Sequence, residues 1–115
     1  MEVFVVMDKS MMGRGVFGVF SNVERATAFY EDLTPGDRNL LEVKALRVTG
    51  VCDPSTSLYV AHAYDDLYDV QVFDGIYATS YLARDASGPK GMIVEFVVDS
   101  PGTRKIIQGW RPDNL

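Results

Sequence analysis

Apolar and polar residues alternate along much of this chain, and a period of two indicates β-strands rather than helices. In the first half, this alternation predicts strands at residues 2–8, 16–21 and 40–48. A short glycine-containing stretch at 9–15 separates the first two strands. We therefore expect these two strands to pair as a hairpin.

A helical pattern interrupts the alternation after the second strand. Ser21 is followed three residues later by Glu24, which is the spacing of a capping box. Apolar residues then recur at helical intervals as far as Leu33. The stretch 34–37, TPGD, is expected to end this helix, because proline cannot continue it and glycine permits a sharp exit.

The second half of the chain repeats this order after a linker at 49–57. The expected elements are two strands, a short helix capped by Thr79 and a further strand, at 58–64, 70–78, 80–86 and 92–98. When the halves are aligned, the second carries an extra residue near Asp74 and Gly75. This extra residue predicts a β-bulge.

Each half is thus predicted to be strand–strand–helix–strand, which suggests an internal repeat of residues 1–50 and 57–102 within a single domain, 1–115. We predict an α+β fold with a mostly antiparallel sheet and two helices, built from two pseudo-symmetric β-β-α-β units. The alternative is a ferredoxin-like α+β sandwich, obtained by leaving one strand out of each half. The C-terminal residues 103–115 are expected to form a short docking segment.

Composition narrows the range of partners. The chain has 115 residues, of which 47% are hydrophobic and 23% charged, as is typical of a soluble globular domain. Its net charge is −5 and its basic residues are scattered, so we predict no nucleic-acid partner. It has no apolar run long enough for a membrane span and no signal-like start, and its single cysteine, Cys52, cannot form an internal disulfide. We therefore expect a cytoplasmic protein without a membrane partner.

The segment 62–69, HAYDDLYD, is the strongest candidate for chemistry. It holds the only histidine, His62, beside Tyr64 and three aspartates, Asp65, Asp66 and Asp69. One interpretation is a half-buried histidine followed by a solvated acidic turn. The other is a ligand cleft, a cation site or an acid–base pair. The spacing of the aspartates does not match a calcium-binding loop, and no second histidine is present, so no metal, cofactor or catalytic residue is predicted.

Three apolar residues are candidates for protein contacts. Met11 and Met12 are adjacent in the first hairpin loop, where solvent-facing residues are expected, and flexible methionines suit adaptable contact surfaces. Trp110 lies in the predicted docking segment. The alternative is that these side chains fold back over the core.

Two functional hypotheses follow. The first is a non-enzymatic binding or protein-interaction module that acts as a homo-oligomer, with a dimer favoured and another protein partner possible. The second is a small enzyme or ligand-binding protein with a cleft near His62 and the Asp65–Asp69 turn. Because no nucleophile–base pair or cofactor motif is visible, the first hypothesis is favoured over an enzyme.

Overall fold

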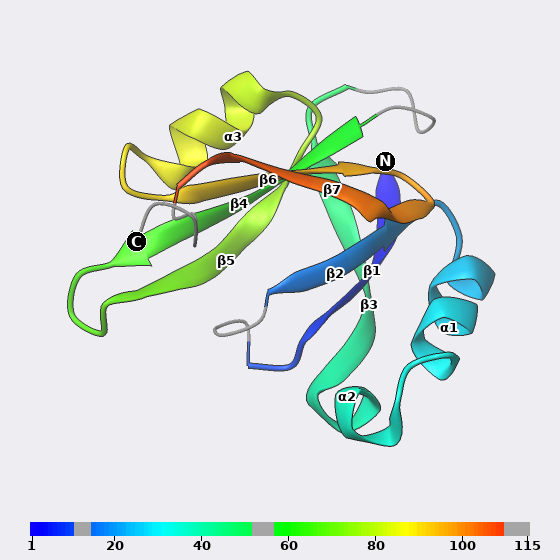
Figure 1. Cartoon of the computed structure of the whole chain (residues 1–115). Helices are drawn as coiled ribbons and strands as arrows, with labels where there is room; N and C mark the ends of the chain where they lie inside the picture. Colours follow the sequence, from blue (N-terminus) through cyan, green and yellow to red (C-terminus); the bar gives the residue numbers. More distant parts are fainter. Residues whose placement is uncertain (11–14, 52–56, 110–115) are drawn as a thin grey trace.

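A computed structural model of the protein describes residues 1–10, 15–51 and 57–109 (Figure 1). Within these residues the chain forms seven strands and three helices. In chain order they are β1 (Glu2–Asp8), β2 (Val16–Phe20), α1 (Val23–Glu31), α2 (Pro35–Leu40), β3 (Leu41–Thr49), β4 (Ser57–Asp65), β5 (Val70–Tyr77), α3 (Ser80–Ser87), β6 (Met92–Val97) and β7 (Ser100–Gln108).

The strands form one mixed sheet in the order β2-β1-β3-β5-β4-β6-β7. β3 and β5 pair in parallel, through Val48 with Ile76 and Thr49 with Tyr77. The other neighbouring strands in this order pair antiparallel. The sheet curls until its two edge strands, β2 and β7, lie against each other, so the whole is nearly closed and barrel-like (Figure 1).

The predicted fold class is therefore wrong. The molecule is neither a two-helix assembly of antiparallel units nor a ferredoxin-like sandwich, because its halves share one mixed sheet and the described residues form three helices. The halves join edge to edge through β3 and β5, which covers two strand edges that would otherwise be open. This parallel contact involves two residue pairs, and so short a pairing leaves no periodic signal in the sequence.

The predicted strands agree with the structure more closely than the predicted fold class does. Both hairpins are confirmed, since β1 pairs with β2 and β4 pairs with β5. The bulge is confirmed as well, because the register between β4 and β5 skips Asp74. A matching shift between β1 and β2 skips Phe17. The internal duplication of residues 1–50 and 57–102 itself stays a prediction.

The helix termini correct two details. Asn22, rather than Ser21, is the N-cap of α1, and its side chain accepts a hydrogen bond of 2.9 Å from the backbone N–H of Arg25. The stretch 34–37 begins α2 instead of only ending α1. Thr34 accepts from the N–H of Asp37, and the proline occupies the first turn, where its missing N–H is not needed.

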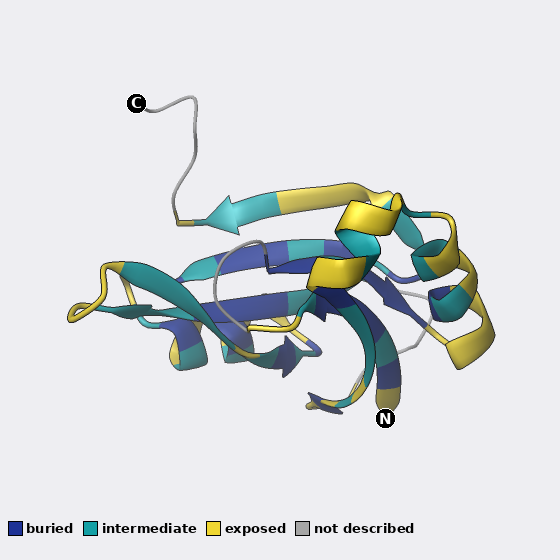
Figure 2. Ribbon diagram, turned by 90° about the horizontal axis from the view of Figure 1, so that it is seen from below, coloured by how far each residue is buried: buried dark blue, intermediate teal, exposed yellow. Residues whose placement is uncertain are grey.

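Buried residues gather in three clusters on the two sides of the curled sheet. The largest, on the inner side, is formed by strand residues such as Val5, Leu58 and Phe96. On the outer side, α1 covers a second cluster through Ala26, and α3 covers a third through Ala83 (Figure 2). The predicted docking segment, 103–115, begins inside β7, which pairs with β6. The sheet therefore has one more strand after β6 than the sequence pattern predicted.

Candidate functional site

His62 is a core residue of β4. Its side chain is 4% exposed and lies on the same side of the strand as Leu58 and Val60, which belong to the inner cluster. The Phe73 ring meets the imidazole edge-on at 6.0 Å between centroids. Neither ring nitrogen has a hydrogen-bond partner in the described part of the chain. Burial lowers the pKa of His62, and the Asp74 carboxylate and a weak polar contact with the Met92 backbone only partly oppose this, so the imidazole is neutral at pH 7.

The predicted acidic residues form the turn between β4 and β5, which we call the β4–β5 tip (residues 65–69). Asp65 accepts hydrogen bonds from the backbone N–H groups of Leu67 (2.9 Å) and Tyr68 (3.2 Å). The Tyr64 hydroxyl donates to Asp69, which adopts a left-handed backbone with φ of 54°. Each of these two carboxylates thus fixes the shape of the turn.

The structure brings Tyr64 together with the acidic residues but not His62. Asp66 forms an ion pair with Lys90, at 3.6 Å, and the Lys90 ammonium lies 5.7 Å from the centre of the Tyr64 ring. None of these hydrogen bonds and ion pairs of the turn involves His62. Across residues 1–10, 15–51 and 57–109, no group of three or more histidine, cysteine or acidic side chains could hold a metal ion.

Apolar side chains, rather than carboxylates alone, face the solvent at the β4–β5 tip. Leu67 is 81% exposed and Tyr68 is 69% exposed. The backbone that carries them is fixed by the hydrogen bonds to Asp65 and by a further bond of 2.8 Å from the N–H of Asp69 to the Asp65 carbonyl. The tip is therefore a pre-shaped apolar projection with acidic flanks.

Other tyrosines of the second half are tied to carboxylates. Tyr77 donates to Asp74, and its burial together with this hydrogen bond raises its pKa to about 12. Tyr59 donates to Glu95 at 3.2 Å, and burial is again the main reason that its pKa is raised. Both hydroxyls remain protonated at neutral pH. The Tyr59–Glu95 bond joins the neighbouring strands β4 and β6, whereas Tyr77 and Asp74 both lie on β5.

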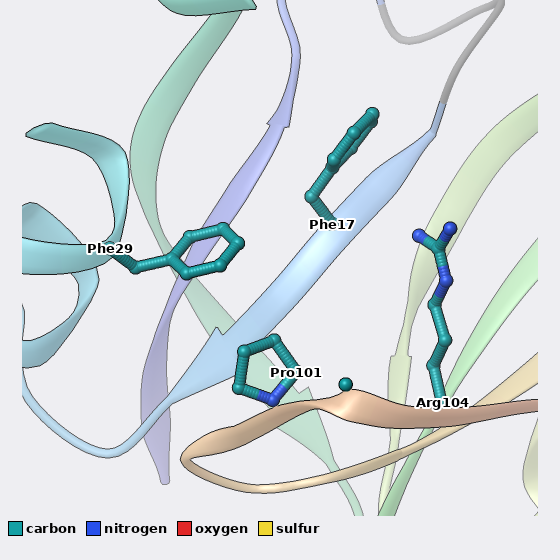
Figure 3. Close-up of a pocket in the computed structure, with 5 residues that line it drawn as sticks. Phe17, Phe29, Pro101 and Arg104 are labelled. Atoms are coloured by element: carbon teal, nitrogen blue, oxygen red, sulfur yellow. The ribbon is translucent and has the colours of Figure 1, made fainter. Parts of the chain in front are cut away.

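An open groove lies elsewhere, where α1, β2 and β7 meet. Its lining residues come from these three elements and are Phe17, Phe29, Pro101, Gly102 and Arg104. We call it the seam groove. Figure 3 shows Phe29 reaching from α1 toward β2, Phe17 rising from β2, and Pro101 and Arg104 on the β7 side. Its volume of about 370 Å³ is at the lower end of the range for ligand sites.

The two sides of the seam groove are held by Asp99, directly before β7. Its backbone N–H donates to the Val19 carbonyl at 2.9 Å. Its carboxylate accepts from the N–H and the hydroxyl of Ser21, at 2.9 and 2.7 Å, and lies 3.5 Å from the Arg25 guanidinium. Asp99 therefore joins the start of β7 to the end of β2, and the groove opens beyond this junction.

The chemistry of the seam groove is apolar with one cation. Arg104 is the only charged residue among its five lining residues, and its guanidinium lies 5.6 Å from the centre of the Phe17 ring. This contact is a cation–π arrangement at an exposed site. A groove of two phenylalanines and an arginine suits apolar groups that carry a carboxylate, which the local charge of Arg104 can attract.

No local pattern in the sequence indicates the seam groove. Its residues are far apart in the chain and share no motif, and only the position of Phe17 at a bulge distinguishes any of them. The predicted contact residues Met11, Met12 and Trp110, as well as Cys52, lie outside the described residues.

In the part of the chain that the structure describes, no helix has both the length and the apolar character needed to cross a membrane. Comparison with known proteins does not assign the chain to a family: no family model, no curated protein and no solved structure matches it.

Proposed function

We propose that this protein is a non-enzymatic binding module whose seam groove takes up an apolar, acidic segment of a protein partner. One observation carries the proposal: Phe17 and Phe29 line an open groove beside Arg104, at the junction of the two edge strands of the sheet. Apolar surface next to strand edges is a common means of binding an extended peptide.

The shape of the seam groove favours a peptide over a small metabolite. Small-molecule sites usually enclose most of their ligand, whereas this groove is shallow and open to solvent. Phenylalanine and arginine are residue types that contribute strongly to protein interfaces. The groove therefore suits one or two apolar side chains, with a carboxylate placed near Arg104.

The alternative, a small enzyme or ligand-binding protein with a cleft near His62, has less support. His62 lies in the core with a lowered pKa, and its side chain faces Phe73 instead of the acidic turn. A general base must reach the proton that it abstracts. A buried imidazole on the inner side of the sheet does not suit that role.

Two further expectations belong to this proposal. The homo-oligomer expected from the sequence agrees with a module that binds protein segments. A reducing, cytoplasmic setting is supported by the single cysteine, which cannot form a disulfide within the chain.

The proposal is tested with two labelled hexapeptides that share an isoleucine–phenylalanine pair. In one the pair is flanked on both sides by two glutamates, and in the other by two lysines. Fluorescence anisotropy is measured against the wild type, Arg104→Glu and Arg84→Glu. We expect the wild type to bind the acidic peptide about fivefold more tightly, which corresponds to about 1 kcal/mol. Arg104→Glu should abolish or reverse this preference.

Arg84→Glu is the matched control. Arg84 is an exposed arginine on α3, so its reversal changes the net charge equally without altering the seam groove. It should keep the wild-type preference. The proposal fails if neither peptide binds at concentrations up to about 1 mM, or if both arginine variants change binding to the same extent.

A further inference from the structure

We propose that the seam groove of one molecule receives the β4–β5 tip of a second copy of the same chain, so that the protein assembles head to tail. This inference rests on the proposed function, because it names the partner of the same groove. It also accounts for Leu67 and Tyr68, two large apolar side chains that are 81% and 69% exposed on adjacent residues.

The shape of the tip supports this partner. Asp65 accepts from the N–H groups of Leu67 and Tyr68, and Tyr64 donates to Asp69, so the turn has one defined backbone conformation. A segment that is already ordered loses little conformational entropy on binding. The tip is therefore a pre-organised ligand rather than a loose loop.

The two surfaces are chemically complementary. The tip presents a leucine and a tyrosine between the acidic residues Asp66 and Asp69, all four exposed. Asp66 forms an exposed ion pair with Lys90, which a guanidinium can replace, and Asp69 accepts from Tyr64 through one of its two oxygens. The groove presents two phenylalanines and a pyrrolidine ring beside the exposed Arg104. Aromatic and aliphatic groups can then pack together while a carboxylate approaches the guanidinium.

The positions of the two surfaces exclude binding within one molecule. The tip lies at the free end of the β4–β5 hairpin, which points away from α1 (Figures 1 and 2), whereas the groove is lined by residues of α1, β2 and β7. One molecule therefore uses its tip toward one neighbour and its groove toward another. Such heterologous contacts produce a ring or an open chain, whereas the sequence favoured a dimer.

The test is sedimentation velocity on the full chain, from about 1 μM to about 1 mM, the concentration range of transient contacts. The wild type should self-associate as concentration rises. Leu67→Ser/Tyr68→Ser should weaken self-association at least about tenfold, because truncated central apolar residues dominate interface energies. Arg104→Glu should weaken it from the other side of the contact.

The matched control is Leu40→Ser/Tyr81→Ser. Leu40 and Tyr81 are another leucine and another tyrosine at exposed positions, 52% and 79%, on α2 and α3. This control should assemble like the wild type. Thermal melts by circular dichroism check folding, and the independent groove variant Arg104→Glu remains informative if the tip variant fails to fold.

A mixing experiment tests the head-to-tail order itself. The tip double variant keeps its groove, and Arg104→Glu keeps its tip, so an equimolar mixture can form one intact contact per pair. Native mass spectrometry should show a heterodimer that contains one chain of each variant, and nothing larger. A symmetric contact between two tips or between two grooves would give no such complementation.

The outcomes separate this inference from the proposed function. If the wild type stays monomeric but binds the acidic hexapeptide, the groove has another protein partner and the self-assembly is overturned. The same conclusion holds if the wild type assembles but the tip variant does so equally well. If the wild type neither assembles nor binds either hexapeptide, both proposals fail.

Discussion

At the scale of single residues, His62 is the most unusual feature of the core. It is a polar side chain among apolar neighbours, with two ring nitrogens that lack partners in the described structure. Leaving buried polar atoms without hydrogen bonds costs about 1–3 kcal/mol. In the hairpin of the first half, the position that corresponds to His62 by register is Met7, which is also buried. We therefore expect an apolar residue of similar size to fit at position 62.

Replacing His62 by methionine should stabilise the protein by about 1–2 kcal/mol at pH 7, because the unpartnered nitrogens are removed and a flexible apolar side chain fills the space. Urea unfolding at neutral pH measures this change. A loss of stability of similar size would show that the imidazole has a partner on which folding depends.

The same residue gives the wild type a pH dependence. The pKa of His62 is lowered in the folded state from the ordinary value of 6.5, so between the folded and the ordinary value the unfolded chain binds more protons. Stability should therefore be highest above about pH 6.5 and fall on acidification, with a slope of at most about 1.4 kcal/mol per pH unit, the limit for a single proton. His62 is the only histidine, so His62→Met should flatten this slope.

His62→Gln is the control that separates the gain in stability at pH 7 from the pH dependence of stability. Glutamine keeps a polar side chain but does not titrate between pH 5 and 7. It should lose the pH slope without gaining the stability expected for methionine. Unfolding curves at pH 5.5 and 7.5 for all three proteins separate the two contributions, and a slope that survives in both variants would exclude His62 as its source.

At the scale of elements, the turn from α3 into β6 lies directly against β4. A Cβ atom on Gly91 would lie 2.3 Å from the backbone carbonyl oxygens of His62 and Ser87. The amide of Gln108 also reaches the carbonyl of Gly91, at 3.1 Å, so β7 joins the same contact. Four elements meet at a place where no side chain fits.

Gly91→Ala should therefore destabilise the protein by about 3 kcal/mol, because backbone atoms, and not a flexible side chain, must move. Gly36→Ala is the matched control, since no atom lies within 4 Å of its added Cβ in the described structure, and it should be neutral or slightly stabilising in helix α2. Thermal or urea unfolding compares the two. Equal effects of the two substitutions would contradict the close approach.

At the scale of the whole molecule, the curled sheet is fastened at the junction between β2 and β7. Asp99 bridges this junction through its bonds to Ser21 and Val19, and it has a left-handed backbone with φ of 64°. Aspartate and asparagine tolerate that conformation better than other residues that carry a side chain. The same residue thus closes the sheet and positions the groove.

Asp99→Ala should lower the free energy of unfolding by about 2 kcal/mol, because the carboxylate that accepts from Ser21 is lost and alanine is strained at positive φ. Asp99→Asn should cost about half as much, because it keeps one carbonyl acceptor and tolerates the backbone. Arg25→Ala should cost less than about 1 kcal/mol, as is usual for an exposed ion pair. Denaturant unfolding ranks the three variants, and a different order would show that the junction depends on other contacts.

Much of the local structure follows from short-range chemistry. Alternation located the first six strands, and the extra residue near Asp74 located a bulge. Thr79 was recognised as the N-cap of α3, where it accepts from the N–H of Leu82. These features depend on neighbours within a few residues, so the sequence displays them directly. The cap of α1 was misplaced by one residue because serine and asparagine are adjacent and both are good caps.

The candidate site was not predictable in this way. His62 and the acidic turn stand together in the sequence, but alternation along β4 and the turn after it send them to different environments. Phe17, Phe29 and Arg104 stand far apart in the sequence and come together only when β7 returns to β2. No local spacing relates them.

The sequence by itself thus determined the first six strands, the two hairpins and the acidic turn, because each depends on side-chain periodicity and turn chemistry within a short segment. Tertiary structure alone decided that the halves join by the parallel contact of β3 with β5, that His62 enters the core and that the edges of the sheet meet at Asp99. Those outcomes depend on which strand edges and apolar faces cover one another across the whole chain, and this is a property of the complete packing arrangement and not of any one segment.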